Sequence, residues 1–159
     1  MPDFILELAR PADAQHLAEM SRDHIETGLG WHYRKEALRQ LMADPDTNVV
    51  VARTAPNSPV IGFAVMSYQG FEAHLVLLAV APAWRRRGVA TALVQWHLKA
   101  ARVAGAQSLA VELRADNAPA RRFYAKLDFR IIQRIDKSYG GTVAALCMVK
   151  DLRVNPDAG

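Results

Sequence analysis

Three consecutive arginines, Arg85 to Arg87, stand directly before Gly88, and a run with helical spacing begins at Val89. The first N–H groups of a helix lack intrahelical partners, and the helix dipole leaves partial positive charge there. Cations at that end are unfavourable unless an anion binds, and guanidinium groups are forked donors to phosphate oxygens. The glycine allows close approach to the backbone. The loop is therefore predicted to bind a pyrophosphate, with a solvated turn as the alternative.

The surroundings of this loop favour the phosphate-binding interpretation. Residues 74–80 before it are apolar at nearly every position, as in a strand covered on both faces. No Gly-Lys-Ser/Thr follows Gly88, which excludes a Walker A loop. The absence of Gly-x-Gly-x-x-Gly argues against a dinucleotide fingerprint. A phosphate-binding turn between a buried strand and a helix remains.

The spacing of apolar residues predicts strands and helices in one mixed sheet. Alternating or β-branched runs predict strands at 4–9, 48–53, 60–68, 74–80, 108–114, 129–135 and 142–149. Spacings of three and four predict helices at 14–25, 34–42, 89–103 and 117–127. Asp13 and Asn117 are the expected N-caps, and Gly105 ends the third helix. The expected class is α/β or α+β with three layers, in a single domain covering residues 1–159.

A second motif, "DNAPARRFYAKLDF" at residues 116–129, has an asparagine before a helix that carries Phe-Tyr. With Arg85-Arg86-Arg87-Gly88-Val89-Ala90, which fits Arg/Gln-x-x-Gly-x-Gly/Ala without gaps, it resembles the GCN5-related N-acetyltransferases, the GNAT family. The similarity spans about residues 75–130. Asp128 departs from it, because the family usually has glycine at this helix end and aspartate tolerates the left-handed conformation less well.

The resemblance implies the GNAT fold, a mixed and mostly antiparallel sheet of about seven strands flanked by about four helices. Its central parallel pair is expected to splay between the strands that end near Val80 and Leu113. The implied activity is transfer of acetyl from acetyl-CoA, the co-substrate, to a primary amine. The middle region is most similar to the ribosomal-protein alanine N-acetyltransferases, whose strand end is matched by "VELRADN". The segments "GLGWHY" and "DKSYGG" do not match that group, so the acceptor is open between a protein N-terminus and a small-molecule amine.

Residue roles carry over from the resemblance position by position. It implies that Glu112 is the general base and Tyr124 the general acid. Backbone groups of one strand end would meet the pantetheine arm and thioester, the loop would hold the pyrophosphate, and a helix cap would contact the coenzyme arm. The implied cofactor-binding residues are Leu78, Ala79, Val80, Arg85, Arg86, Arg87, Gly88, Val89, Ala90, Thr91 and Asn117.

The residue patterns themselves leave alternatives at both catalytic positions. Glu112 projects from the less apolar face of its strand, where it could receive a proton or simply pair with Arg114. A phenol with a pKa near 10 keeps its proton at neutral pH, but a tyrosine beside Phe123 also fits a core position. The reserve candidates for the base are Glu26, Glu72 and His74.

Other reactive or aromatic side chains receive simpler interpretations. Trp31, His32 and Tyr33 lie in a break between helices and are expected to line the acceptor pocket. Cys147 is expected to be a small core residue. No metal site is predicted, because the histidines have no partner set of metal-binding type.

Composition sets limits on the class of protein. The longest apolar run, residues 75–84, is too short to cross a bilayer, and a single cysteine allows no internal disulfide. We therefore expect a cytoplasmic protein that acts without a membrane. The net charge of +4 is modest and no nucleic-acid-binding motif is present, so no nucleic-acid partner is expected. A non-catalytic module that binds or senses acyl-CoA is the alternative function, and a homodimer is one option for the oligomeric state.

Overall fold

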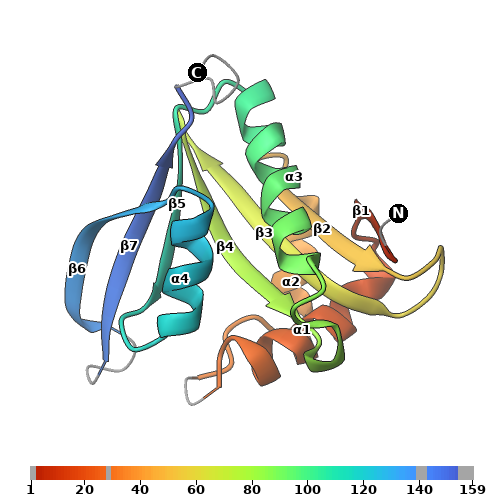
Figure 1. Ribbon diagram of the computed structural model, residues 1–159. Helices are drawn as coiled ribbons and strands as arrows, with labels where there is room; N and C mark the ends of the chain where they lie inside the picture. The colour runs from red at the N-terminus through yellow and green to blue at the C-terminus, as the bar shows by residue number, and fades with distance from the viewer. Residues whose placement is uncertain (1–2, 28–29, 139–142, 154–159) are drawn as a thin grey trace. The chain divides into compact units, whose positions relative to one another are not determined.

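The computed structural model describes residues 3–27, 30–138 and 143–153 (Figure 1). In these ranges the strands are β1 (Ile5–Leu8), β2 (Thr47–Arg53), β3 (Val60–Gln69), β4 (Glu72–Val80), β5 (Ser108–Arg114), β6 (Arg130–Ser138) and β7 (Val143–Asp151). The helices are α1 (Ala14–His24), α2 (Lys35–Ala43), α3 (Val89–Val103) and α4 (Ala118–Lys126), with 3-10 turns η1 (Pro11–Asp13) and η2 (Pro82–Trp84). The predicted order of elements is confirmed. None of the helices in these ranges is long and apolar enough to span a membrane.

The strands form one sheet in the order β1-β2-β3-β4-β5-β7-β6. Strands β4 and β5 are parallel, with Glu72–Leu75 beside Ser108–Val111. The β1–β2, β2–β3, β5–β7 and β6–β7 pairs are antiparallel. The mixed, mostly antiparallel sheet with a central parallel pair is therefore confirmed, whereas the splaying of that pair beyond Leu75 stays a prediction.

The chain divides into two compact units. The first unit comprises Met1–Ser67 and Val76–Lys99, and the second comprises Tyr68–Leu75 and Ala100–Gly159. The arginine loop belongs to the first unit, and Glu112, Asn117 and Tyr124 belong to the second. The prediction of a single domain stays a prediction.

The first unit packs helices on both faces of its strands. On one face, α1 and α2 bury Leu17 and Leu38 against Phe63 and Leu77. Full burial of such a side chain contributes about 1.5–3 kcal/mol. On the other face, α3 lies so close to β3 that a Cβ added to Gly62 would be 2.9 Å from Val89 Cγ1. This contact fixes the first turn of α3, and with it the position of the arginine loop within the unit.

A buried arginine ties together the start of the chain. Arg53 at the end of β2 is 4% exposed and donates from Nε to Glu7 at 2.6 Å, from Nη2 to Asp13 and from Nη1 to the Ser58 carbonyl at 2.8 Å. The Asp13 carboxylate also accepts from the Arg10 N–H at 2.8 Å. Asp13 makes no side-chain cap hydrogen bond to α1. Asp13 thus occupies the predicted N-cap position of α1, but its side chain does not cap the helix, because the carboxylate is used by Arg53 and by η1.

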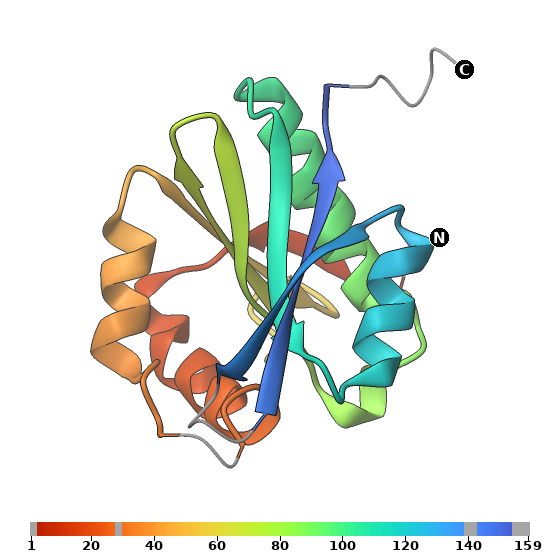
Figure 2. The same ribbon diagram turned by 90° about the vertical axis from the view of Figure 1, so that its left-hand side faces the viewer.

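The second unit packs α4 beside β5, β6 and β7 (Figure 2). The Asn117 side chain accepts from the Ala120 N–H at 3.1 Å, which confirms it as the N-cap of α4. The helix ends at Lys126 with Leu127 as its C-cap, and Asp128 follows with a left-handed φ of 68°. Lys150 Nζ donates to the Leu127 carbonyl at 2.8 Å and so satisfies one carbonyl at this helix end. These local interactions orient the face of α4 that carries Tyr124.

Candidate active site

The arginine loop of the first unit joins η2 to α3 through two left-handed residues. Arg86 has a φ of 63° and Gly88 a φ of 84°. The first helical hydrogen bond here runs from the Ala92 N–H to the Gly88 carbonyl at 3.0 Å. The N–H groups of residues 88–91 precede that bond and are the unpaired donors of the α3 N-terminus. The backbone thus has the unpaired N–H groups that an anion-binding helix start needs, and binding of an anion there stays a prediction.

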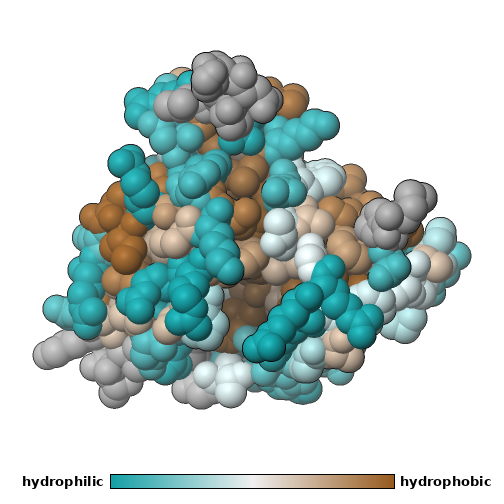
Figure 3. All heavy atoms as spheres, viewed as in Figure 1, coloured by the Kyte–Doolittle hydropathy of each residue, from teal (hydrophilic) through white to brown (hydrophobic). Residues whose placement is uncertain are grey.

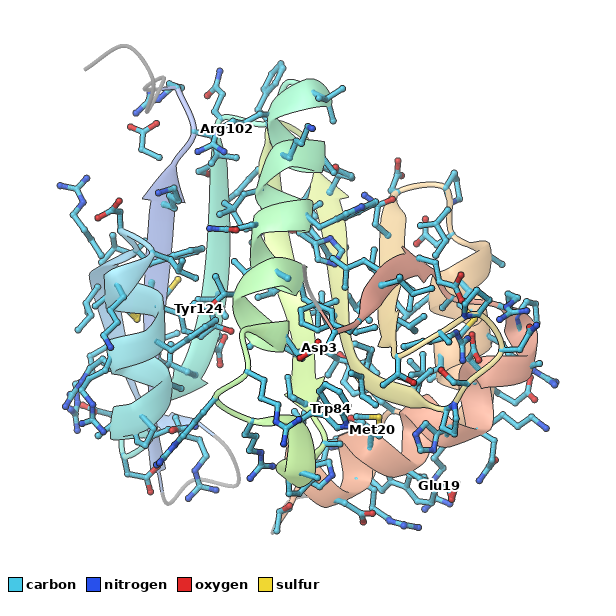
Figure 4. All side chains as sticks on the ribbon, turned by 45° about the vertical axis from the view of Figure 1, so that its right-hand side comes forward. Asp3, Glu19, Met20, Trp84, Arg102 and Tyr124 are labelled. Atoms are coloured by element: carbon cyan, nitrogen blue, oxygen red, sulfur yellow. The ribbon has the colours of Figure 1, made fainter. Side chains whose placement is uncertain are left out.

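The three arginines surround this helix start in different ways. Arg85 donates from Nε to the Val80 carbonyl at 3.3 Å, and its Nη2 is 3.5 Å from His24 Nδ1. The Arg87 guanidinium lies 4.9 Å from the centroid of the Trp84 ring, and Figure 4 labels Trp84 near the start of α3. No described carboxylate of the first unit forms an ion pair with Arg85, Arg86 or Arg87. The positive charge of the loop is therefore not neutralised within this unit.

The loop is exposed from Arg85 to Gly88, and Figure 3 shows hydrophilic residues gathered over this part of the surface. A Cβ added to Gly88 would have no atom within 4 Å. Open space, backbone donors and uncompensated cations together fit a diphosphate group, which carries several anionic oxygens. Val89 is buried and anchors the helix, whereas Ala90 and Thr91 are half-buried in its first turn.

The end of β4 supplies the backbone groups predicted to meet the pantetheine arm. Ala79 and Val80 are buried, and Leu78 is half-buried. The Ala81 N–H donates to the Ile61 carbonyl of β3 at 2.8 Å. Because N–H groups alternate in direction along a strand, the Val80 N–H is directed away from β3. Val80, and not Ala81, is the donor at this strand end that β3 leaves available.

Glu112 lies on an exposed position of β5 in the second unit and is directly opposite Cys147 of β7. Cys147 is half-buried, and its thiol pKa is raised first by burial and then by the carboxylates of Glu112 and Glu72. Arg114, the predicted alternative partner of Glu112, forms a forked pair with Asp116, with both N–O distances at 3.1 Å. Glu112 thus projects from the polar face of its strand, as predicted.

The reserve candidates Glu72 and His74 belong to the same face as Glu112. Glu72 pairs with Ser108 and His74 with Ala110, and residues two apart on a strand share a face. His74 Nε2 is 3.6 Å from Glu72 Oε1. The second unit therefore has three groups that could accept a proton on one face, together with Cys147.

Tyr124 lies on the side of α4 that faces β5, where Figure 4 labels it, and is 5% exposed. Its ring makes edge contacts with Phe123 and Phe129, at centroid distances of 5.0 and 5.3 Å. Burial raises the pKa of the Tyr124 phenol well above its usual value near 10. The phenol is therefore protonated at neutral pH, whether it serves as an acid or only as a core residue.

The segment that follows α1 contains the residues predicted to line the acceptor pocket and the reserve base Glu26. Trp31 and Tyr33 are half-buried against the core of the first unit, and His32 is exposed. Glu26 is buried and hydrogen-bonded to backbone N–H groups. Gly28 and Leu29 of "GLGWHY", and residues 139–141 of "DKSYGG", lie outside the described residues. In the described ranges no group of three or more His, Cys, Asp or Glu side chains is arranged to hold a metal ion.

Comparison with known proteins adds a direct test of the motif assignment. The profile of the acetyltransferase (GNAT) family matches residues 12–129, which include the arginine loop, Glu112 and Tyr124. The chain belongs to the acetyltransferase (GNAT) family. The predicted enzyme class, an acetyl-CoA-dependent acetyltransferase that modifies an amine, is confirmed with it, and acetyl-CoA is the co-substrate.

Two curated relatives of this acetyltransferase are archaeal proteins named N-alpha-acetyltransferase. The protein from Saccharolobus solfataricus is 24% identical over 94% of both chains. The protein from Sulfurisphaera tokodaii is 35% identical over 80 residues, which are 50% of this chain and 48% of the relative. The chain thus matches about half the length of the second relative.

Solved structures share the fold of this acetyltransferase. The structure of Arabidopsis thaliana NAA60 in complex with acetyl-CoA has a TM-score of 0.82 at 20% identity, covering 95% of this chain and 99% of that chain. The ribosomal-protein-S18-alanine N-acetyltransferase from Escherichia coli has a TM-score of 0.75 at 20% identity, covering 97% of both chains. The second structure agrees with the group that the middle region resembles, at the level of fold.

Sequence patterns missed two features of the acetyltransferase. One is the cross-strand neighbour of Glu112, Cys147, because the β5–β7 register cannot be read from either strand alone. The positions of polar residues at every second place along each strand nevertheless show which residues share a face, and this limits the possible β5–β7 registers. The other is the burial of Glu26, for which no local signal exists, since its hydrogen-bond donors lie five to seven residues away.

Proposed function

We propose that this acetyltransferase transfers acetyl to the α-amine of a protein or peptide N-terminus, with a small-molecule amine as the alternative acceptor. Both curated relatives carry the name N-alpha-acetyltransferase. The free energy needed to deprotonate the acceptor amine also supports the proposal. An α-amine with a pKa of about 7.7–8.0 costs about 1 kcal/mol to deprotonate at pH 7, whereas a lysine amine costs about 4–5 kcal/mol.

Glu112 serves in this proposal as the general base. Its carboxylate is exposed on β5 and can take the ammonium proton directly or through one water. The neutral amine nitrogen then forms a bond to the acetyl carbon, and the bond between that carbon and the coenzyme sulfur breaks.

Tyr124 serves as the general acid. The thiolate that leaves the acetyl carbon accepts the phenolic proton, and the proton released from the amine restores the phenol through solvent. The phenol is protonated at neutral pH and so has a proton to give to the leaving group. The observation that carries the proposal is the name N-alpha-acetyltransferase, which both curated relatives share. The Val80 N–H, directed away from β3, is the donor proposed for the oxygen of the reacting carbonyl.

The coenzyme is proposed to lie along residues that precede and begin α3. The diphosphate would bind the N–H groups of residues 88–91 and the guanidinium groups of Arg85 to Arg87. The Asn117 Oδ1 is used by the helix cap, which leaves its amide NH₂ for the coenzyme arm. Acetyl-CoA supplies the acyl group as a thioester when it is bound.

The test is an assay of free-thiol release with N-terminal peptides, small amines and lysine side-chain analogues. We expect Tyr124→Phe to lower kcat about 100-fold or more, while the Kd of acetyl-CoA stays within twofold. Glu112→Gln should weaken the acidic limb of the kcat/KM pH profile. Cys147→Ala, the cross-strand neighbour, is the matched control and should leave that limb unchanged.

Equal activity of Tyr124→Phe would remove the phenol from the mechanism. Binding of acetyl-CoA without turnover of any acceptor would instead favour the non-catalytic acyl-CoA module. An unchanged pH profile in Glu112→Gln would direct attention to Glu72 and His74, which share its face of the sheet.

A further inference from the structure

Glu26, two residues after α1 ends, is a carboxylate that is only 6% exposed. Buried carboxylates are rare unless their oxygens are hydrogen-bonded. Glu26 Oε2 accepts from the Ser21 hydroxyl at 2.8 Å, and Oε1 accepts from the His32 N–H at 2.6 Å and the Tyr33 N–H at 3.2 Å. The Tyr33 N–H is also 3.3 Å from Oε2. One carboxylate therefore joins the end of α1 to both N–H groups of a segment six and seven residues later.

The same segment is fixed by contacts on its other side. The Trp31 indole donates to the Tyr33 carbonyl at 3.2 Å, and Arg34 Nε donates to the Trp31 carbonyl at 3.3 Å. The guanidinium groups of Arg22 and Arg34 lie 5.2 and 4.6 Å from the Trp31 ring centroid. Trp31 and Tyr33 also pack against the core of the first unit. These two rings are thus largely used to hold the segment in place.

His32, between them, is different. It is exposed, and its ring lies beside Gly30, where an added Cβ would be 3.4 Å from His32 Nε2. Among the three aromatic residues predicted to line the acceptor pocket, His32 is the one whose side chain is most available to a substrate. Its backbone N–H makes the shortest bond to Glu26.

We propose that Glu26 is a positioning residue for the acceptor: it holds the backbone of His32 and Tyr33 so that the His32 side chain is presented to the amine substrate. This inference rests on the proposed function. It also assigns Glu26 a role other than the reserve base, because the oxygens of its buried carboxylate already accept from Ser21, His32 and Tyr33. A group so engaged has to lose backbone bonds before it can accept a proton from a substrate.

The experiment compares steady-state kinetics of the full chain with and without the backbone bonds. Glu26→Leu keeps much of the side-chain volume but removes the oxygens that accept from the His32 and Tyr33 N–H groups. We expect it to raise the acceptor KM about tenfold, with kcat changed less than threefold and the Kd of acetyl-CoA within twofold. Glu26→Asp retains the carboxylate and should recover part of the lost affinity.

Two further variants separate positioning from general stability. Ser21→Ala removes one donor to the same carboxylate but leaves both backbone bonds, so its acceptor KM should change less than threefold. His32→Ala should raise the acceptor KM without changing hydrogen exchange at the Tyr33 amide, whereas Glu26→Leu should speed exchange at both amides. If Glu26→Leu does not fold, Glu26→Asp, which shortens the side chain and lengthens the backbone bonds, gives the same test with a smaller change in KM.

An unchanged acceptor KM in the folded Glu26 variants would overturn the inference. A fall in kcat at constant KM would also overturn it, because that result places Glu26 in the chemical step. Failure of the proposed function has a separate signature: the wild-type protein would then acetylate no amine in the panel, and the positioning role would fall with it.

Discussion

Arg53 and the Arg85 to Arg87 loop use the same side chain in opposite surroundings within the first unit. Arg53 is 4% exposed, and its donors are taken up by Glu7, Asp13 and a carbonyl. The loop arginines are exposed, contact a carbonyl, an imidazole and an indole ring, and form no ion pair with a described carboxylate of that unit. A cation surrounded by carboxylates serves the fold, whereas cations at a helix N-terminus without carboxylates are suited to an external anion.

The backbone strengthens this contrast. Arg53 ends β2, where the register with β3 shifts, and its φ is not positive, whereas Arg86 is held at a φ of 63°. A non-glycine residue in the left-handed region costs about 1–2 kcal/mol. The first unit thus accepts local strain at the loop where the ligand is expected, and none at the arginine that stabilises the fold.

The largest expected effect comes from removing the structural cation. Arg53→Ala leaves Glu7 and Asp13 without their buried partner and should lower the free energy of unfolding by about 3–5 kcal/mol. Urea unfolding followed by circular dichroism measures this change. Arg39→Ala, which removes an exposed pair with Glu36, is the matched control and should cost less than about 0.5 kcal/mol. Similar losses in the two variants would contradict the contrast.

His97 provides the next test, because its buried imidazole would become a cation on protonation and forms no ion pair with a described carboxylate. His97 is fully buried, and burial lowers its pKa from 6.5 to about 4. Above pH 6.5 both folded and unfolded chains hold it neutral, so its contribution is fully present. As the pH falls from 6.5 to 4, His97 becomes protonated in the unfolded chain but stays largely neutral in the folded chain. The free energy of unfolding should therefore fall by about 3 kcal/mol.

Unfolding curves between pH 7 and pH 4 measure this loss. His97→Leu should flatten the pH dependence in that window, whatever its effect on stability at pH 7. A slope that persists in the variant would assign the acid sensitivity to other groups.

Substitution of Arg86 should change stability and coenzyme binding in opposite directions. Arg86→Gly relieves the left-handed conformation and should raise the free energy of unfolding by about 1 kcal/mol. The same change removes a guanidinium from the loop and should weaken acetyl-CoA binding about tenfold, with a smaller salt dependence. Calorimetry and urea unfolding measure the two effects. Loss of stability together with unchanged binding would show that Arg86 serves the fold as Arg53 does.

Substitution of Asp128 should have the smallest effect on stability, and it is the control for the Arg86 substitution. It has a similar φ of 68° at the end of α4, and its carboxylate is 3.7 Å from Lys150 Nζ on the surface. Asp128→Gly should raise stability by about 0.5–1 kcal/mol and leave acetyl-CoA affinity within twofold. A large loss of affinity would mean that the strand and helix end around Asp128 contribute to coenzyme binding.

Local signals in the sequence predicted much of this arrangement. The arginine–glycine loop, the Asn117 cap and the left-handed Asp128 depend on neighbours within four residues, so the sequence contains their causes. Asp13 stands at the N-cap position that the local pattern predicts, but its carboxylate binds Arg53, forty residues away, and does not bind the helix N–H groups. The burial of Glu26 and the position of Cys147 opposite Glu112 could not be predicted for the same reason. Burial follows from tertiary packing, and cross-strand neighbours follow from strand register. The catalytic roles of Glu112 and Tyr124 came from the family resemblance and stay predictions.

The stacking of Arg87 on Trp84 gives the protein an intrinsic optical probe. A guanidinium close to an indole alters its emission, and a phosphate that draws Arg87 away from the ring would change that emission without any attached dye. Replacing Trp31 and Trp96 with phenylalanine would leave Trp84 as the one fluorophore of its kind, so that occupancy of the loop could be followed in real time during turnover.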